Sequence, residues 1–263
     1  MKTIKLATWN VNGIRAALKK GFAEWLQQQN PDIICLQETK AHINDIPTEI
    51  FTDLGYHCHW HSAHKKGYSG VGILSKQAPD QVTIGCGIPQ YDHEGRVLRA
   101  DFGNLSVLSV YMPSGSSGED RQNFKMQFLA DFRPFIEQLL QQRPQLIIAG
   151  DYNIAHQAID IHDPIRNANA SGFLPEEREW LSDFLTLGIT DTFRHQYPQQ
   201  KDHYSWWSFR ANARQNNKGW RIDYICASLP IAQTIQDAGI YPHIQHSDHC
   251  PIWVDIAPIS VSS

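Results

Sequence analysis

The stretch Gln145-Leu146-Ile147-Ile148-Ala149-Gly150-Asp151-Tyr152-Asn153 leads from an apolar run into two polar side chains. The apolar run predicts a buried strand that ends at Asp151. Gly150 leaves the backbone free to turn there, and Asp151 and Asn153, two residues apart, point the same way. The carboxylate can orient a water or take its proton, and the amide can donate to a phosphate oxygen. An Asx turn that caps the strand explains the pair equally well.

A similar arrangement, a polar residue at or just beyond an end of an apolar strand, recurs along the chain. The other residues in this position are Asn10, Glu38, Tyr111, Asp223, Asp248 and His249. Hydrophobic periodicity predicts strands at 4–9, 32–37, 56–60, 70–74, 105–111, 145–150, 220–225 and 251–256, and helices at 16–29, 121–141 and 175–187. Polar side chains at strand ends are typical of a site built on an α/β scaffold.

Strands outnumber helices in this pattern, which indicates two packed β-sheets flanked by helices rather than one doubly wound sheet. A chain of 263 residues is long enough to bury a core on two sheets. It contains no linker, low-complexity tract or fixed-period repeat. We therefore expect a single domain over residues 1–263.

Cysteine usage and hydropathy bear on the compartment. The five cysteines are scattered, odd in number and without a CxxC pair, which argues against a disulfide scaffold and favours a reducing cytoplasm. No apolar run approaches the length of a bilayer span. The N-terminus, Met1-Lys2-Thr3-Ile4-Lys5-Leu6, lacks the apolar region of a signal peptide. A membrane partner is not expected.

The charge distribution is uneven although the net charge is only −4. Residues 1–22 and 205–222 contain no Asp or Glu. Their basic residues are Lys2, Lys5, Arg15, Lys19 and Lys20 in the first segment and Arg210, Arg214, Lys218 and Arg221 in the second. Two acid-free basic segments in an acidic protein suggest a face that binds phosphate, with chance clustering on a solvated surface as the alternative.

Two acids and a histidine suggest chemistry at the strand ends. Glu38 offers the hard oxygen that Mg²⁺ prefers, although a solvated strand-end acid explains Glu38 alone better. Asp223 lies in an apolar strand, where a carboxylate is costly unless it is paired. His249 is its natural partner, because an Asp–His pair fixes the imidazole tautomer and stabilises its charged form.

A run of histidines, His57, His59, His61 and His64, resembles a metal-binding tract. The first three share one face of the predicted strand. No cysteine pair or second ligand cluster completes a zinc site, so we interpret them as structural or surface histidines.

Six motifs occur in one order along the chain. They are Trp9-Asn10-Val11-Asn12-Gly13-Ile14-Arg15, Leu36-Gln37-Glu38-Thr39-Lys40, Gly67-Tyr68-Ser69-Gly70-Val71, Gly150-Asp151-Tyr152-Asn153, Trp220-Arg221-Ile222-Asp223-Tyr224 and Ser247-Asp248-His249. In combination they closely resemble the exonuclease III / AP endonuclease family, within the endonuclease–exonuclease–phosphatase superfamily. The resemblance covers essentially the whole chain.

The resemblance implies a four-layer α/β sandwich and a DNA-repair nuclease of base excision repair. Its expected reactions are magnesium-dependent hydrolysis of DNA phosphodiesters 5′ to abasic sites and at 3′ ends, as a 3′–5′ exonuclease and a 3′-phosphatase or phosphodiesterase. The implied cofactor is Mg²⁺, with Mn²⁺ as a substitute. The implied partner is double-stranded DNA, abasic or 3′-blocked, bound by a monomer.

Site roles also follow from the resemblance, residue by residue. Glu38 looks like the main metal ligand, with Asn10 and Asp248 nearby and with Asp151 and Asn153 in the same ligand set. Asp151 would orient and deprotonate the attacking water. Asn153 and Tyr111 would hold the scissile phosphate. His249, oriented by Asp223, would bind a phosphate oxygen and stabilise the developing charge.

DNA contacts are implied for Arg15, Lys20, Tyr68, Asn167 and Arg210. Trp206, Trp220 and Ile222 match an aromatic pocket that receives a flipped, base-free sugar, and flipping is cheapest where the base is already lost. Trp207 is expected in the core instead.

The chain departs from its relatives at a few positions. Asn12 stands where some relatives carry an acid, which puts a second metal position in doubt. Ser114 stands where relatives often have Asn or Gln, and Ala170 replaces a second pocket Asn. His162 and Arg166 are bulky enough to narrow the pocket.

Two rival functions remain at this stage. One is a catalytically inactive nucleic-acid-binding regulator on the same scaffold. The other is a phosphatase of the same superfamily that acts on another phosphate ester, such as a lipid or inositol phosphate.

Overall fold

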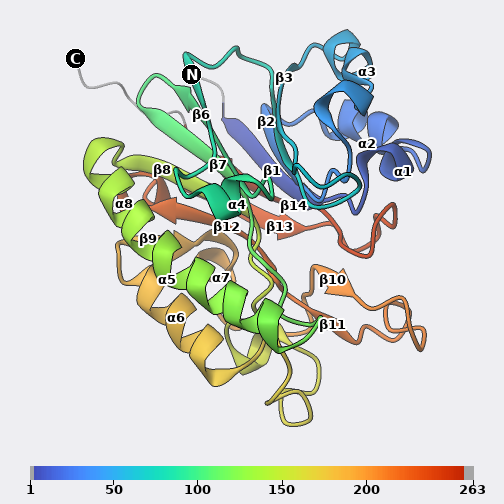
Figure 1. The fold of residues 1–263 in the computed structure, drawn as a ribbon, viewed down its shortest axis with the longest axis vertical. Helices are drawn as coiled ribbons and strands as arrows, with labels where there is room; N and C mark the ends of the chain where they lie inside the picture. Colours follow the sequence, from blue (N-terminus) through green and yellow to red (C-terminus); the bar gives the residue numbers. More distant parts are fainter. Residues whose placement is uncertain (1–2, 258–263) are drawn as a thin grey trace.

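The computed structural model describes residues 3–257, and within them two six-stranded sheets pack face to face with helices on their outer sides (Figure 1). The first sheet has the order β13 (Ile235–Ile240), β14 (Ile252–Ile256), β1 (Ile4–Asn10), β2 (Ile33–Gln37), β4 (Val71–Ser75) and β3 (His57–His61). The second has the order β5 (Gln81–Ile84), β6 (Val97–Phe102), β7 (Leu105–Tyr111), β8 (Gln145–Asp151), β12 (Asp223–Ser228) and β9 (Ile189–Asp191). The predicted four-layer sandwich is confirmed.

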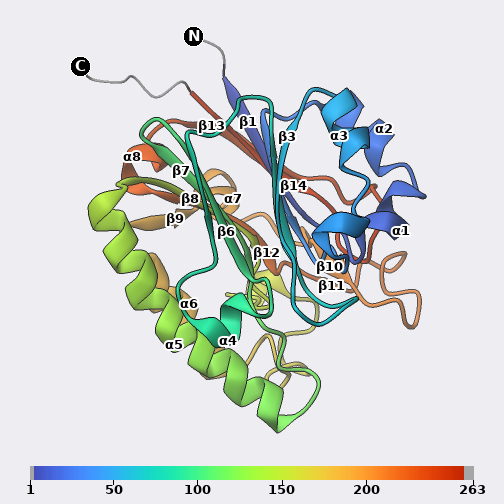
Figure 2. The same ribbon diagram turned by 45° about the horizontal axis from the view of Figure 1, so that its top comes forward.

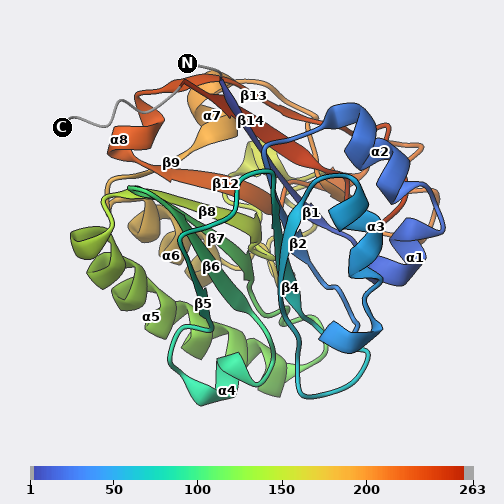
Figure 3. The same cartoon turned by 90° about the horizontal axis from the view of Figure 1, so that it is seen from above.

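Helices cover the two outer faces, as the view from above shows (Figure 3). Those on the first sheet are α1 (Ile14–Leu18), α2 (Phe22–Gln29) and α3 (Thr48–Asp53), and those on the second are α5 (Glu119–Gln142) and α6 (Pro175–Leu185). Shorter elements complete the chain: α4 (Pro89–Asp92), α7 (Thr192–Gln196), α8 (Leu229–Ala232), the 3₁₀ turns η1 (Ile43–Asp45) and η2 (Ala158–Asp160), and the ribbon of β10 (Trp206–Trp207) and β11 (Gly219–Trp220).

Strand periodicity explains the layers. In β8, Leu146 and Ile148 pack with α5 and α6, whereas Ile147 and Ala149 point between the sheets. In β2, Ile34 and Leu36 face the helices in the same way. Because successive side chains of a strand point to opposite faces, a strand buried on both sides reads as a continuous apolar run.

Strand direction brings the polar strand ends together. β1 runs parallel to β2, and β7 runs parallel to β8 with Tyr111 beside Asp151. β12 is antiparallel to β8 and places Asp223 opposite Asp151. The β10–β11 ribbon lies close to these ends (Figure 2).

Two predicted elements are wrong in their continuity. The helix expected over 16–29 is two helices, because Gly21 takes a left-handed φ of 98° between α1 and α2. The strand expected over 220–225 is broken between β11 and β12. There the side chain of Arg221 turns inward to pair with Asp160 and Asp191.

No helix in the part of the chain that the structure describes is long and apolar enough to cross a membrane.

Candidate active site between the sheets

Most of the predicted strand-end residues line one cavity of about 240 Å³, and Asn10 and Asp223 bind residues of its wall. Its lining residues come from β7 and β8 of the second sheet, from the β10–β11 ribbon and from loops, among them the loop after β2 and the loop before β14. They are Glu38, Tyr111, Ser114, Ser116, Asp151, Asn153, Ser171, Gly172, Trp206, Trp220, Ile222, Asp248 and His249.

Asp151 stands at the centre of the polar cluster and is 1% exposed. The side-chain amide of Asn10 donates to Asp151 Oδ2 (2.9 Å) and to Glu38 Oε1 (2.8 Å). The backbone N–H of Asn153 donates to Asp151 Oδ1 (2.8 Å). Both oxygens of this carboxylate are therefore fixed in direction.

His249 stands between two carboxylates. Its Nδ1 lies 2.8 Å from Asp223 Oδ2, and its Nε2 lies 3.8 Å from Asp151 Oδ2. The expected Asp223–His249 pair is thus present. Since Asp223 occupies Nδ1, the Nε2 edge of the imidazole faces Asp151 and the cavity.

Burial and neighbouring charges shift the pKa values of this pair. Burial raises the pKa of Asp151 to about 7, with the nearby charge of His249 opposing the shift. Burial alone would lower the pKa of His249, but Asp223 and Asp151 outweigh it and raise that pKa to about 10. The attraction between the two groups favours a cationic His249 beside an ionised Asp151.

Glycine and asparagine shape the turn after β8. A Cβ on Gly150, whose φ is 152°, would lie 1.9 Å from the carbonyl oxygen of Val110 on β7. Asn153 is left-handed, with a φ of 53°, and its amide donates to the carbonyl of Met112 (3.0 Å). The Asx geometry of Asp151 is present, but it holds Asn153 at the cavity instead of merely capping the strand.

On the other side of the cavity, Lys40 lies 2.7 Å from Glu38 Oε2 and also donates to Asn12 Oδ1. Asn12 in turn donates to Asp248 Oδ1 (2.8 Å). Trp206 Nε1 donates to the other oxygen of Asp248 (3.0 Å). Both oxygens of Asp248 therefore accept hydrogen bonds from protein groups, and Lys40 connects the carboxylate of Glu38 to the amide of Asn12.

Arg96 is a buried arginine that contacts Tyr111 and that the sequence analysis did not single out. Arg96 donates to the backbone oxygen of Tyr111 (2.8 Å) and lies over its ring at 5.0 Å. It also donates to the hydroxyl of Tyr68 (3.1 Å), as Arg121 does (2.9 Å). Burial raises the pKa of Tyr111 well above its usual value, and the charge of Glu38 adds to that shift.

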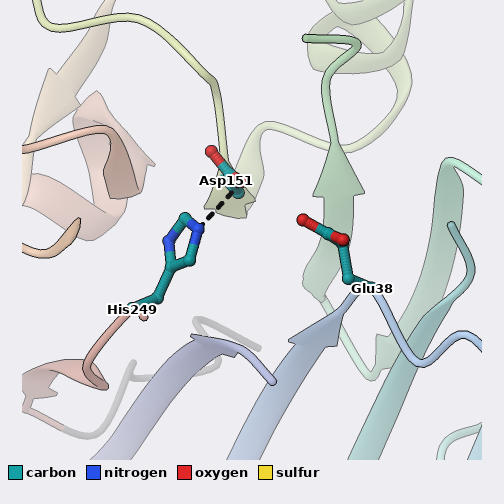
Figure 4. Close-up of side chains that lie close together, drawn as sticks. All are labelled: Glu38, Asp151 and His249. Carbon is teal, nitrogen blue, oxygen red and sulfur yellow. Dashed lines mark ion pairs between the residues drawn. The ribbon is translucent and has the colours of Figure 1, made fainter. Parts of the chain in front are cut away.

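Ligand atoms of Glu38, Asp151 and His249 lie within 4.8 Å of one another (Figure 4). The carboxylate oxygens suit Mg²⁺, which takes one or two carboxylates and keeps several waters. His249 fits a ligand role poorly, because Asp223 and Asp151 favour its cationic form. The amide of Asn10 points its nitrogen at both acids and its oxygen at the backbone N–H of Asn12. Glu38 and Asp151 are thus the groups that fit a magnesium ion.

The expected sugar pocket is apolar. Trp206 and Trp220 meet edge to face with their ring centroids 5.9 Å apart, and Ile222 packs with them. Trp207 is 3% exposed in a separate cluster, as expected. The amide of Asn167 donates to carbonyls within its own loop, those of His162 and Asp163.

The expected phosphate-binding face is only partly realised. Arg15, Lys20 and Arg210 are exposed. Arg221, however, is 1% exposed and is paired with Asp160 and Asp191, so its place in that face is wrong. Arg214 donates to the backbone carbonyls of Ser247, Pro242 and Ile244. Lys2 lies outside the described residues.

Lys125 is a second residue that the sequence reasoning missed. It is fully buried and donates to the carbonyl of Asn153 (2.7 Å) and to Glu177 (2.6 Å). A signal was present, since Lys125 shares the spacing of the buried face of α5 with Phe128, Leu129 and Phe132. A lysine at a core position calls for a buried partner.

Comparison with known proteins places this geometry in a family. Residues 7–249 match the model of the endonuclease/exonuclease/phosphatase family. An exodeoxyribonuclease of Bacillus subtilis is 45% identical over 95% of this chain and 98% of its own length. The DNA repair nuclease APEX1 of Danio rerio is 40% identical over 97% of this chain and 82% of its own length.

Solved structures agree. An AP endonuclease from Archaeoglobus fulgidus superposes with a TM-score of 0.90 at 30% identity, over 97% of this chain and all of its own. A 3′ phosphatase from Neisseria, bound to a product DNA hairpin, superposes with a TM-score of 0.90 at 29% identity and the same coverage. With its sandwich and its strand-end cluster, the chain belongs to the endonuclease/exonuclease/phosphatase family.

Proposed function

We propose that the protein is a magnesium-dependent DNA-repair nuclease that cuts the backbone 5′ to abasic sites and trims 3′ ends. The observation that carries the proposal is the contact of Asp151 with Asn10, Asn153 and His249 at a cavity walled by Trp206 and Trp220. The names of its relatives, an exodeoxyribonuclease and AP endonucleases, support both halves of the activity.

Residues of the chain supply most of the expected chemistry. A bound Mg²⁺ on Glu38 and Asp151 would neutralise charge on the scissile phosphate. Asp151 orients the attacking water and takes its proton, a role that its place at the cavity allows. His249, cationic and held by Asp223, faces a phosphate oxygen through Nε2. Asn153 and Tyr111 hold the phosphate from the second sheet.

Substrate selection is assigned to the apolar end of the cavity. A base-free sugar would lie against the wall that Trp206, Trp220 and Ile222 form, whereas a paired base would have to be unstacked first. Arg15, Lys20 and Arg210 are exposed cations that would contact the DNA backbone. We further propose that the chain acts as a monomeric single domain in the cytoplasm, in keeping with its five free cysteines.

Neither rival function is favoured. An inactive regulator would not need the buried Asp223–His249 pair in contact with Asp151. A phosphatase for lipid or inositol phosphates would not need two tryptophans beside the acids.

Three duplexes test the proposal: one abasic, one with a recessed 3′ end and one with a 3′-phosphate, each with Mg²⁺ or EDTA. We expect magnesium-dependent cleavage of all three and no release of phosphate from phosphoinositides. Activity on phosphoinositides without activity on DNA would refute the proposal in favour of the phosphatase.

A further inference from the structure

Lys125, on the inner face of α5, is a charged side chain with 0% exposure. Its ammonium donates to Glu177 Oε1 (2.6 Å) and to the backbone carbonyl of Asn153 (2.7 Å). Lys125 therefore connects Glu177, in the first turn of α6, to Asn153, the residue that we assign to the scissile phosphate.

Glu177 continues the connection. Its second oxygen accepts hydrogen bonds from the backbone N–H groups of Gly172 (2.6 Å) and Leu174 (3.0 Å). Gln122 donates to the first oxygen (3.0 Å) and accepts from the hydroxyl of Ser171 (2.7 Å). Here Gln122, Lys125, Ser171 and Glu177 are called the Lys125 cluster.

The Lys125 cluster supports one wall of the cavity. Asn153, Ser171 and Gly172 all line that cavity, and each is bound to the cluster or belongs to it. Gly172 packs closely against Trp220 and Asn153. A Cβ on Gly172 would be 3.0 Å from the ring of Trp220 and 3.1 Å from the carbonyl oxygen of Asn153. The Lys125 cluster therefore contacts both the proposed phosphate-binding residue, Asn153, and Gly172, which packs on the wall of the proposed sugar pocket.

Stability alone gives a poor reason for such a pair. Two charges without access to water lose hydration, and well-packed apolar side chains in their place are often as stable or more so. Asn153 has a left-handed backbone (φ 53°), which few residues other than glycine, asparagine and aspartate adopt. Lys125 donates to its carbonyl, and Asp151 accepts from its N–H. Both backbone polar groups of Asn153 are therefore held by side chains.

We propose that Lys125 is a positioning residue that sets the phosphate contact of Asn153 directly and, through Glu177, the wall of the sugar pocket at Gly172. This inference rests on the proposed function. It predicts that loss of Lys125 lowers kcat much more than it weakens DNA binding. Misplacement of a catalytic contact by about 1 Å lowers rates by roughly 100-fold.

The test compares Lys125→Met with the double variant Lys125→Met/Glu177→Gln, in which no unpaired carboxylate is left buried. Arg143→Met is the matched control. Arg143 is the C-cap of the same helix, and its guanidinium binds Ser106 at the other end of α5. We expect kcat on an abasic duplex to fall about 10- to 100-fold in both Lys125 variants, with KM within about threefold of wild type. Arg143→Met should keep its kcat.

A cycle with Asn153→Ala separates positioning from general damage. If Lys125 acts through Asn153, Lys125→Met should lower kcat little further in the Asn153→Ala background, since effects of residues that act as a unit are not additive. Two results would overturn the proposal. One is that the losses of kcat from Lys125→Met and Asn153→Ala are fully additive, and the other is an unchanged kcat in a folded Lys125→Met/Glu177→Gln variant.

An NMR measurement keeps the inference separate from the proposed activity. The backbone amide signals of Asn153 and Gly172 should move in Lys125→Met and stay in place in Arg143→Met. Unmoved signals would overturn the positioning role even if the wild-type protein cleaves abasic DNA. Shifted signals in a protein that cleaves no DNA would instead refute the nuclease assignment and leave the positioning role supported.

Discussion

At the scale of single residues, Asp151 combines an elevated pKa with fixed geometry. Four groups contact its carboxylate: the amide of Asn10, the backbone N–H and the side-chain amide of Asn153, and the imidazole of His249. An asparagine in its place keeps the shape but can take no proton from a water.

Asp151→Asn is therefore expected to lower single-turnover cleavage of an abasic duplex by about 100- to 10,000-fold, the usual contribution of a general base. DNA affinity without Mg²⁺ should stay within about threefold of wild type, because the exposed cations remain. Preserved cleavage rates would remove Asp151 from the proposed role.

Asp160 gives a second prediction at this scale, this time for stability. Burial alone would raise its pKa, but Arg221 and Arg194 hold the pKa at about 2, below the usual value of an aspartate. The unfolded chain thus binds a proton first as pH falls, so this stabilisation is present above about pH 4 and is lost between about pH 4 and 2.

Asp160→Asn should reduce the free energy of unfolding by about 2 kcal/mol at pH 7. The difference from wild type should narrow as pH falls through that window. Urea unfolding at pH 7, 4, 3 and 2 measures it. Stability curves that run parallel from pH 7 to 2 would mean that the ion pairs do not lower this pKa.

At the scale of elements, the close approach of β8 to β7 decides where the site begins. Gly150 faces the carbonyl of Val110, at a distance that no Cβ can occupy. The next residue is Asp151, so any shift of the strand at Gly150 moves the carboxylate.

Gly150→Ala should destabilise the protein by roughly 3 kcal/mol, as overpacking against backbone does, and should lower activity more than tenfold. Gly103→Ala is the control, because Gly103 also has a positive φ (57°) but has no atom within 4 Å of its added Cβ. Thermal unfolding and cleavage rates of both variants check this. Equal effects would point to φ strain alone rather than the contact with β7.

Much of the element pattern could be predicted from the sequence, because period-two burial and turn chemistry are local. β1, β2, β7 and β8 lie within a residue of their expected bounds. β5, β6, β9 and β13 were not predicted. β5 and β13 are edge strands with mostly half-exposed or exposed side chains, and they show no clean apolar run.

At the scale of the whole molecule, the two sheets meet at the proposed metal site. Glu38 follows β2 of the first sheet, and Asp151 ends β8 of the second. An ion held by both carboxylates would connect the two sheets. It would bind only the folded protein, because the two carboxylates are close together only in the folded state.

Mg²⁺ should therefore raise the melting temperature, by an amount that corresponds to about 2.7 kcal/mol at 100 times its Kd. Glu38→Ala should lose most of this rise and require more Mg²⁺ for cleavage. Potassium chloride of equal ionic strength is the control. An equal rise in both proteins, with an unchanged magnesium requirement, would remove Glu38 as a ligand.

The sequence by itself determined the strands that carry the site, such as β1, β2, β7 and β8, the polar residues at their ends and the family of the chain. These depend on short-range periodicity and on motifs of a few residues. Only the tertiary structure decided which of these residues touch. Asn10 reaches Asp151 across 141 positions, and Lys125 reaches Glu177 across 52. The register of the sheets and the packing of α5 set those contacts. Both depend on interactions between segments far apart in the sequence, so no short stretch predicts them. For the same reason, only the folded chain distinguishes Arg221, buried between two acids, from the exposed cations that remain for DNA.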